Sequence, residues 1–300
     1  MRIYDFLTDR DEAVRYLAGS LKEGTLAVFL GAGVSAGAGL PEWPKLVERL
    51  STRAGLLNPL PQSASANDLQ ARVDLVENTI GNHDEYVEAV CQCLYEGVHL
   101  SDGQLMDPLL IALGAMMMGS RRGSVRRVVT LNLDSLLEWY LMLCGLVPRV
   151  VKEPPTLEGA EDVRIYHPHG FLPHPDMTGY SRSKTLILGL DAVFERLGST
   201  KNAWLELLRH LLRTSVCLFV GISFRSFRDP ALAPIIQEIG NEVERLRPVG
   251  FCTLCDKEDA TQENIGEILR RGVVPLTMEK DDVAGFLLKI CQTAGREISV

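Results

Sequence analysis

The residues best suited to chemistry fall in four short stretches, each following a run of apolar residues. The first stretch is Gly31-Ala-Gly-Val-Ser35, which follows five apolar residues ending at Leu30. Glycines let the backbone approach a pyrophosphate, and a helix opening at such a loop presents N–H groups to an anion. A glycine turn that only packs a strand against a helix explains the same residues. The loop alone is weak evidence for a dinucleotide site.

Two common phosphate-binding motifs do not fit this loop. A P-loop is disfavoured because no Gly-Lys-Ser/Thr follows the glycines. A dehydrogenase would carry an acidic residue at the end of a second strand, roughly 20 residues beyond the last glycine. That interval is predicted to be helical here. The loop is therefore not expected to serve hydride transfer.

The second stretch supplies an amide and a carboxylate. Asn132 and Asp134 follow the predicted strand 127–130, and open α/β sheets bind ligands at such strand ends. The Asn132 amide can hydrogen-bond a water or a ribose hydroxyl without carrying charge. Both residues have a structural alternative, which is capping the helix predicted to begin at Ser135.

The third and fourth stretches supply imidazole, glycine and hydroxyl groups. His167 and His169 can exchange protons near neutral pH, but residues two apart in an extended segment share a face, so spacing does not separate them. Gly221 and Ser223 follow the predicted strand 216–220. One interpretation is that both residues line a ligand site at the same edge of the sheet. The alternative is that they only connect the strand to the following loop.

Positioning these stretches requires strands that alternate with helices. Strands are predicted at 26–30, 127–130, 163–166, 185–188, 216–220, 250–254 and 273–276. Asp9 and Glu12 resemble a capping box that opens a first helix, and 45–53, 135–144 and 204–212 have helical spacing. Residues 55–122 are predicted to be a helical insert within a single domain, 1–300. The pattern predicts an α/β fold, with a Rossmann-like, mostly parallel sheet covered by helices on both faces.

Composition limits the function classes. The 300 residues are 46% hydrophobic and 23% charged, which is typical of a globular protein. A net charge of −8 repels phosphate backbones and argues against a dominant nucleic-acid role. No apolar run reaches the roughly 18 residues of a membrane span and no signal peptide is recognised, so a cytoplasmic location is expected. Seven irregularly spaced cysteines predict reduced thiols rather than a disulfide framework.

Taken together, four motifs resemble those of the sirtuins. Gly31-Ala-Gly-Val-Ser35 and Gly39-Leu-Pro-Glu-Trp43 are similar to the family's Gly-Ala-Gly-x-Ser and Gly-Ile/Leu-Pro-x-Phe/Trp. Thr130-Leu-Asn-Leu-Asp134 matches Thr-x-Asn-x-Asp, His169-Gly170 matches His-Gly, and Phe219-Val-Gly-Ile-Ser223 matches a later strand ending in Gly-x-Ser. The motifs occur in the family's order across residues 25 to 260. Their conjunction is far more specific than any one motif.

The resemblance implies a role for each motif. Asn132 would direct a nucleophile, and His169 would be the general base, because the family's catalytic histidine immediately precedes a glycine. Asp134 would accept hydrogen bonds from the nicotinamide carboxamide. Any contribution from His167 stays open. The residues expected to bind NAD are Gly31, Ala32, Gly33, Ser35, Leu40, Pro41, Asp134, Gly221 and Ser223.

The departures from the family narrow the function. Protein-deacylating sirtuins carry two Cys-x-x-Cys pairs for zinc after His-Gly, but no cysteine occurs between Gly170 and Val216. Cys252 and Cys255 fall on a predicted strand, where residues three apart point to opposite faces, so no metal is expected. Cofactor motifs without protein-substrate features imply that NAD itself is the substrate. The chain is similar to the zinc-free, sirtuin-like NAD glycohydrolases of bacterial antiphage defence, which deplete NAD.

An enzyme of that kind needs regulation. Because the predicted catalytic domain fills nearly all 300 residues, we expect a homo-oligomer and a separate partner, such as a HerA-type ATPase or an Argonaute-like protein. No membrane or direct nucleic-acid contact is expected. One alternative is an NAD-binding or ADP-ribose-binding subunit without turnover, and another is a zinc-free protein deacylase or ADP-ribosyltransferase. The basic run from Arg121 to Arg127 is either a solvated loop or a contact for a phosphate or an acidic partner.

Overall fold

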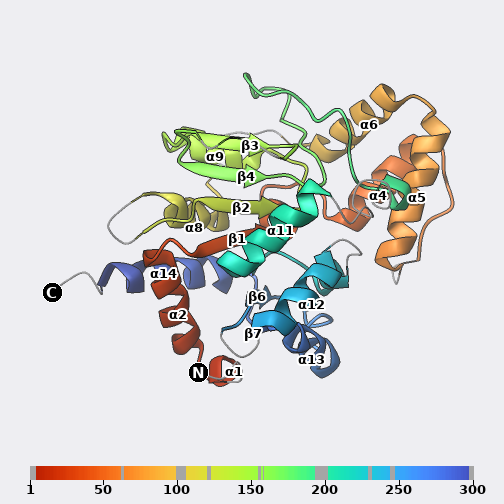
Figure 1. Cartoon of the computed structure of the whole chain (residues 1–300). Coiled ribbons are helices and arrows are strands. Elements are labelled where there is room, and N and C mark those ends of the chain that lie inside the picture. Colours follow the sequence, from red (N-terminus) through yellow and green to blue (C-terminus); the bar gives the residue numbers. More distant parts are fainter. Residues whose placement is uncertain are drawn as a thin grey trace.

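A seven-stranded sheet forms the centre of the molecule in a computed structural model (Figure 1). The strand order is β3-β4-β2-β1-β5-β6-β7, and every neighbouring pair is parallel. The strands are β1 (Leu26–Leu30), β2 (Arg127–Thr130), β3 (Pro148–Val151), β4 (Val163–Tyr166), β5 (Val216–Val220), β6 (Gly250–Leu254) and β7 (Val273–Thr277). The predicted Rossmann-like α/β class is confirmed.

Helices occupy most of the connections between strands. The structure describes residues 5–61, 64–98, 106–119, 123–154, 157, 159–192, 202–228, 232–243 and 247–296. The helices are α1 (Asp5–Thr8), α2 (Arg10–Lys22), α3 (Gly33–Ala36), α4 (Trp43–Arg53), α5 (Ala66–Ile80), α6 (His83–Tyr95), α8 (Pro108–Met117), α9 (Leu136–Leu143), α11 (Ala203–Thr214), the 3-10 helix η1 (Phe224–Arg228), α12 (Leu232–Val243), α13 (Gln262–Arg270) and α14 (Asp282–Arg296). Asp9 is the N-cap of α2, because its carboxylate accepts from the N–H groups of Asp11 and Glu12, but the Asp9 N–H donates to the Asp5 carbonyl and not to Glu12 as a capping box would require.

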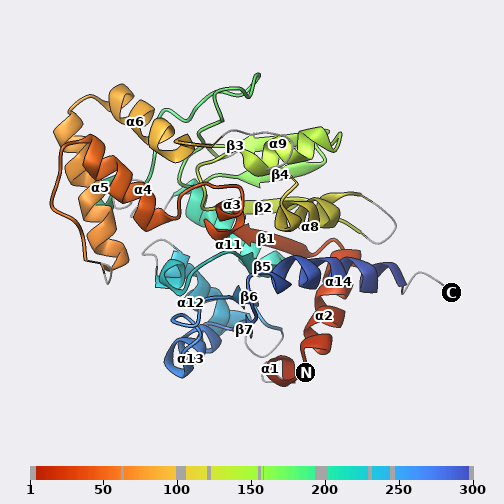
Figure 2. The ribbon, with the colours of Figure 1, turned by 180° about the vertical axis from the view of Figure 1, so that it is seen from behind.

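Side chains alternate between the two faces of the sheet and build one core on each. Val28 and Leu30 of β1 pack into a core with α2, α8, α9 and α14, whereas Ala27 and Phe29 pack into a second core with α11, α12 and α13. Figures 1 and 2 show these two helical layers from opposite sides. All five residues of β1 are buried, as expected of a central parallel strand.

Two strand assignments differ from the prediction. The segment 185–188 is not a strand. Ile187 is joined to His169 by hydrogen bonds and the Ser183 N–H donates to the Phe171 carbonyl, but these contacts do not form a regular ladder. Conversely, β3 was not predicted, since Pro148 in its sequence argues against a strand. The structure explains this exception: β3 lies at the edge of the sheet and Pro148 is its first residue.

The region predicted as a helical insert contains α5, α6 and α8. Helices α5 and α6 pack against α4 and against each other, and α4, α5 and α6 lie together at one side of the sheet (Figures 1 and 2). Helix α8 packs against α14 instead. Residues 62–63, 99–105 and 120–122 lie outside the described part of the chain, and with them Arg121 and Arg122 of the basic run. Arg127 from that run donates a hydrogen bond to the Gly24 carbonyl at 3.3 Å.

Candidate functional site

The carboxyl ends of β1, β2 and β5 meet where the strand order reverses. Strand β1 lies between β2 and β5, so the chain proceeds to one side of β1 first and reaches the other side later. At such a point the loops diverge and leave a crevice that binds ligands in open α/β sheets. The loops after β1, β2, β4 and β5 carry the four stretches singled out in the sequence. Topology therefore brings those stretches to one place.

The glycines after β1 let that loop pack directly on the loop after β5. A Cβ atom on Gly31 would lie 2.5 Å from the Gly221 carbonyl oxygen, and one on Gly33 would lie 3.0 Å from the Gly221 Cα. Gly221 has a φ of 65°, a left-handed conformation that favours glycine. A Cβ atom there would lie 2.7 Å from the Val34 nitrogen. The three glycines are required for assembly of the site, with or without a ligand.

Several amides at the start of α3 already have partners within the protein. The Gly33 N–H donates to the Gly221 carbonyl at 3.0 Å, and the Val34 N–H donates to the Gly31 carbonyl at 3.0 Å. These two groups are thus less free to bind an anion than the motif suggested. A pyrophosphate here would depend on further donors, and the Ser223 hydroxyl is one that lines the same cavity.

Asn132 is oriented by the glycine loop. Its Nδ2 lies 3.0 Å from the Gly31 carbonyl oxygen and 3.1 Å from the Ser35 Oγ. Because a carbonyl oxygen only accepts, the amide nitrogen must face Gly31, and Oδ1 is the atom that can accept from a ligand. The Asn132 side chain therefore joins two loops and does not cap α9.

Asp134 completes a chain of hydrogen bonds that begins at Asn132. The Ser35 hydroxyl donates to Asp134 Oδ2 at 2.8 Å, and the Leu136 N–H donates to Oδ1 at 3.0 Å. Through the second bond Asp134 satisfies an amide in the first turn of α9, although the N-cap residue of that helix is Ser135. The carboxyl group is 6% exposed, and burial raises the pKa of Asp134 although both hydrogen bonds act to lower it. The same side chain lines the cavity.

The tautomer of His169 is set by the backbone. Its Nδ1 lies 2.7 Å from the Ile187 carbonyl oxygen. Since that oxygen only accepts, Nδ1 carries the hydrogen, and the neutral ring has its lone pair on Nε2. His169 also lines the cavity, so it has the tautomer and the location that a general base acting through Nε2 requires.

His167 has a different environment. Its ring is fully buried, with Nδ1 3.1 Å from the Asn132 carbonyl oxygen and Nε2 2.7 Å from Glu138 Oε1. Phe171 packs edge-on against the ring at 4.8 Å. Both ring nitrogens are thus engaged with oxygen atoms, and the side chain supports the loop that carries Asn132.

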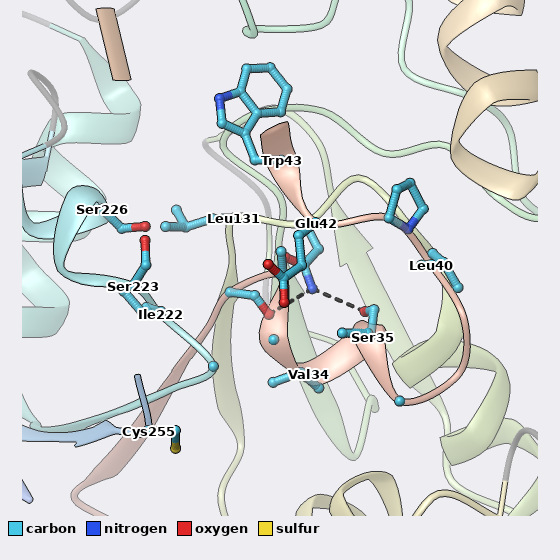
Figure 3. A pocket seen from close by; sticks show the side chains of 18 of the residues that line it. Val34, Ser35, Leu40, Glu42, Trp43, Leu131, Ile222, Ser223, Ser226 and Cys255 are labelled. Atoms are coloured by element: carbon cyan, nitrogen blue, oxygen red, sulfur yellow. Dashed lines mark hydrogen bonds between the residues drawn. The ribbon is translucent and has the colours of Figure 1, made fainter. Parts of the chain in front are cut away.

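One cavity of about 760 Å³ includes all the residues predicted to bind or act on NAD. Its volume is within the range of small-molecule sites. Figure 3 shows Ser223 and Ser226 across the cavity from Ser35 and Leu40, with Trp43 at a third side. The predicted residues that line it are Gly31, Ala32, Gly33, Ser35, Leu40, Pro41, Asn132, Asp134, His169, Gly221 and Ser223.

Two further walls of the cavity were missed in the sequence. Cys255 and Asp256 line it directly after β6, and the rule that ligands bind at strand ends could have found them. Leu69 and Gln70 of α5 line it as well. No pattern in the sequence marks these two residues, because the position of α5 depends on its packing against α4.

Acidic side chains are prominent in the lining. Lys280 supplies a positive charge. The carboxyl-bearing residues among the described lining are Glu42, Asp107, Asp134, Asp256, Glu258, Asp259 and Asp281. Such a lining favours a cationic group over an additional anion.

Cys252 and Cys255 have different environments, because Cys252 lies in β6 and Cys255 lies just beyond the end of that strand. Cys252 is buried in β6, where burial raises its pKa, whereas Cys255 lines the cavity.

Within the described ranges, no group of three or more His, Cys, Asp or Glu side chains is arranged to hold a metal ion. In the same ranges, no helix has the length and apolar character needed to cross a membrane.

A parallel α/β fold with a crevice at its switch point defines a class of proteins that bind ligands at the carboxyl ends of the strands, and comparison with known proteins shows what this chain resembles. Residues 126–270 match the SIR2-like domain. The chain is also 24% identical over 245 residues to the NAD(+) hydrolase ThsA of Bacillus cereus (strain MSX-D12). That similarity covers 80% of this chain and 45% of the relative, so the chain spans less than half of the relative's length.

Proposed function

We propose that this chain is an NAD glycohydrolase that cleaves NAD to nicotinamide and ADP-ribose. The observation that carries the proposal is the hydrogen-bonded chain from Asn132 through Ser35 to Asp134, in one cavity with His169. The SIR2-like domain and the relative named as an NAD(+) hydrolase support the same substrate. At 24% identity, the hydrolytic outcome itself is part of the proposal.

The first step breaks the bond between the nicotinamide nitrogen and ribose C1′. The bonding electron pair goes to the nicotinamide nitrogen, which is cationic in NAD and leaves neutral, so little acid catalysis is needed. The ribose becomes an oxocarbenium-like cation. Carboxylates in the lining, among them Asp134, favour positive charge there, and interactions that strengthen in the transition state accelerate the step.

The second step adds water to C1′. The Asn132 Oδ1 accepts a hydrogen bond from one O–H of the water and directs its oxygen toward C1′. A C1′–O bond forms while the other proton passes to the Nε2 of His169, which is the basic nitrogen in the tautomer fixed by Ile187. The products are ADP-ribose and a protonated His169, which returns its proton to solvent.

Asn132→Ala provides the first test. We expect release of nicotinamide from NAD, followed by chromatography, to fall by at least about 100-fold, since misdirected groups cost that much. Circular dichroism should show an intact fold, and Asn241→Ala, an exposed site on α12, is the matched control. Full turnover in Asn132→Ala would overturn the assignment. Saturable NAD binding without product would instead identify a binding module, and acetyl-ADP-ribose or labelled protein would identify a transferase.

We further propose that the activity serves antiphage defence in the cytoplasm by depleting NAD, under control of homo-oligomerisation and a separate partner protein. The resemblance to zinc-free sirtuin-like defence proteins supports this, as does the relationship to ThsA. The parent chain and Asn132→Ala test this proposal in cells. Bacteria expressing the parent chain with its partner should lose NAD on infection, whereas bacteria expressing Asn132→Ala should keep it.

A further inference from the structure

The orientation of His169 depends on a segment outside the sheet. Besides the bond from His169 Nδ1 to the Ile187 carbonyl, the Ile187 N–H donates to the His169 carbonyl at 2.9 Å. Two hydrogen bonds therefore join these residues. Ile187 and Leu188 are both buried and both line the cavity. Any shift of the segment moves the carbonyl that fixes the His169 ring.

Helix α5 holds this segment from the other side. Asp74 Oδ2 accepts the Leu190 N–H at 3.0 Å, three residues beyond Ile187. A Cβ atom on the intervening Gly189 would lie 1.8 Å from Asp74 Oδ1, so the carboxylate rests directly on the backbone. Only glycine leaves room for that contact.

The position of Asp74 is electrostatically unfavourable. Burial raises its pKa and the nearby Asp191 carboxylate raises it further, while backbone hydrogen bonds from Leu190 and Asp191 lower it. The carboxylate accepts hydrogen bonds from the backbone amides of Leu190 and Asp191, so its geometric effect is to fix the main chain. One turn earlier on the same helix face, Gln70 lines the cavity, is 7% exposed, and has an amide oxygen with no hydrogen-bond partner among the residues that the structure describes.

We propose that Asp74 is a positioning residue for His169: it anchors residues 187–190, so that the Ile187 carbonyl keeps the hydrogen on Nδ1 and the lone pair on Nε2. The inference rests on the proposed function, in which His169 Nε2 takes a proton from water. It makes α5, an element outside the recognised motifs, part of the reaction centre.

Three variants distinguish loss of the contact between Asp74 and residues 189–190 from a general loss of stability. Asp74→Ala removes the acceptor for Leu190, whereas Asp74→Asn keeps an oxygen acceptor and removes the charge. Gly189→Ala pushes the carboxylate away from the opposite side of the contact. Asn78→Ala, exposed and one turn further along α5, is the matched control.

Two measurements are made on each variant. In long-range 1H–15N NMR of the imidazole rings, with the His169 signal assigned from His169→Ala, the parent and Asp74→Asn should show a single tautomer. Asp74→Ala and Gly189→Ala should show a mixture. For NAD cleavage, these two variants should lose about tenfold in kcat, with a changed pH profile and KM within twofold, as found for residues that orient a functional histidine.

An unchanged His169 tautomer in Asp74→Ala and Gly189→Ala would overturn the inference, and so would a parent-like pH profile of kcat. The NMR measurement does not require turnover. If the parent cleaves no NAD but the tautomer shifts in both variants, the proposed function fails and the anchoring role of Asp74 stands. If Asp74→Ala does not fold, Gly189→Ala carries the comparison against Asp74→Asn.

Discussion

His167 and His169 differ in their contacts although only one residue separates them. His167 and its partner Glu138 are 0% and 1% exposed, and no solvent reaches their 2.7 Å contact. His169 is less buried, lies at the cavity, and is held by a single backbone carbonyl at Nδ1. A buried pair contributes to folding, whereas a ring with a basic nitrogen beside a cavity is suited to proton transfer.

Alanine at His167 should therefore lower stability, whereas alanine at His169 should lower activity. His167→Ala leaves the Glu138 carboxylate buried without its partner, which costs about 3–5 kcal/mol of unfolding free energy. His169→Ala should lower kcat for NAD cleavage by about 100-fold to 10,000-fold, with an unfolding midpoint close to that of the parent. Urea unfolding and nicotinamide release measure the two effects. Full activity in His169→Ala would contradict the assignment.

The sequence could identify the candidate residues but not all of their contacts. Spacing left His167 and His169 equivalent, and only the glycine after His169 favoured it by resemblance. What separates them is Glu138, a residue on α9 that no local pattern connects to either histidine. The orientation of Asn132 was likewise beyond sequence reasoning, because it depends on the Gly31 carbonyl in the loop after β1, about 100 residues earlier in the chain.

At the scale of elements, the loops after β1 and β5 form one unit. The 2.5 Å distance from a Gly31 Cβ to the Gly221 carbonyl is too short for any real contact, so an added methyl group must separate the loops. We expect Gly31→Ala to cost about 1–3 kcal/mol of stability, as overpacking does. NAD cleavage should fall by about 100-fold, because the Asn132 side chain is hydrogen-bonded to the Gly31 carbonyl and would be misplaced when that carbonyl moves.

Gly19→Ala is the matched control for that substitution. Gly19 lies in α2, and outside the neighbouring backbone of that helix no atom of the described residues lies within 4 Å of the position of its added Cβ. Alanine there should stabilise the helix by up to about 1 kcal/mol and leave cleavage unchanged. Thermal unfolding and nicotinamide release compare the two variants. Parent-like activity in Gly31→Ala would show that the loop contact does not position Asn132.

Elements with regular patterns were predictable, and elements defined by their neighbours were not. Strands β1, β2, β4, β5 and β6 occupy the predicted residues, since short runs rich in β-branched and other apolar residues are a strong local signal. The segment 185–188 was wrongly predicted as a strand, because its apolar residues are buried in the two cores without joining the sheet ladder. The neighbouring Leu190 N–H is held by Asp74, more than 100 residues earlier in the chain.

At the scale of the whole molecule, the cavity is shared by parts of the chain that fold around different cores. Val34 and Leu133 belong to the core with α2 and α14, whereas Ile222 and Ile187 belong to the core with α11 and α12. All four residues line the cavity. A ligand that fills it must therefore contact both helical layers and also α5 of the insert.

Binding of ADP-ribose should consequently stabilise the molecule as one unit. A ligand that binds only the folded state at 100 times its Kd adds about 2.7 kcal/mol to the free energy of unfolding. As a product, ADP-ribose is not consumed during the measurement. We expect this increase in the parent and in Asn132→Ala, and a smaller one in Gly31→Ala at the same concentration. Hydrogen exchange should slow together in 31–35, 131–134, 187–190 and 221–223. Protection confined to the loops on one side of the sheet would contradict a shared cavity, because a ligand spanning it orders both sides at once.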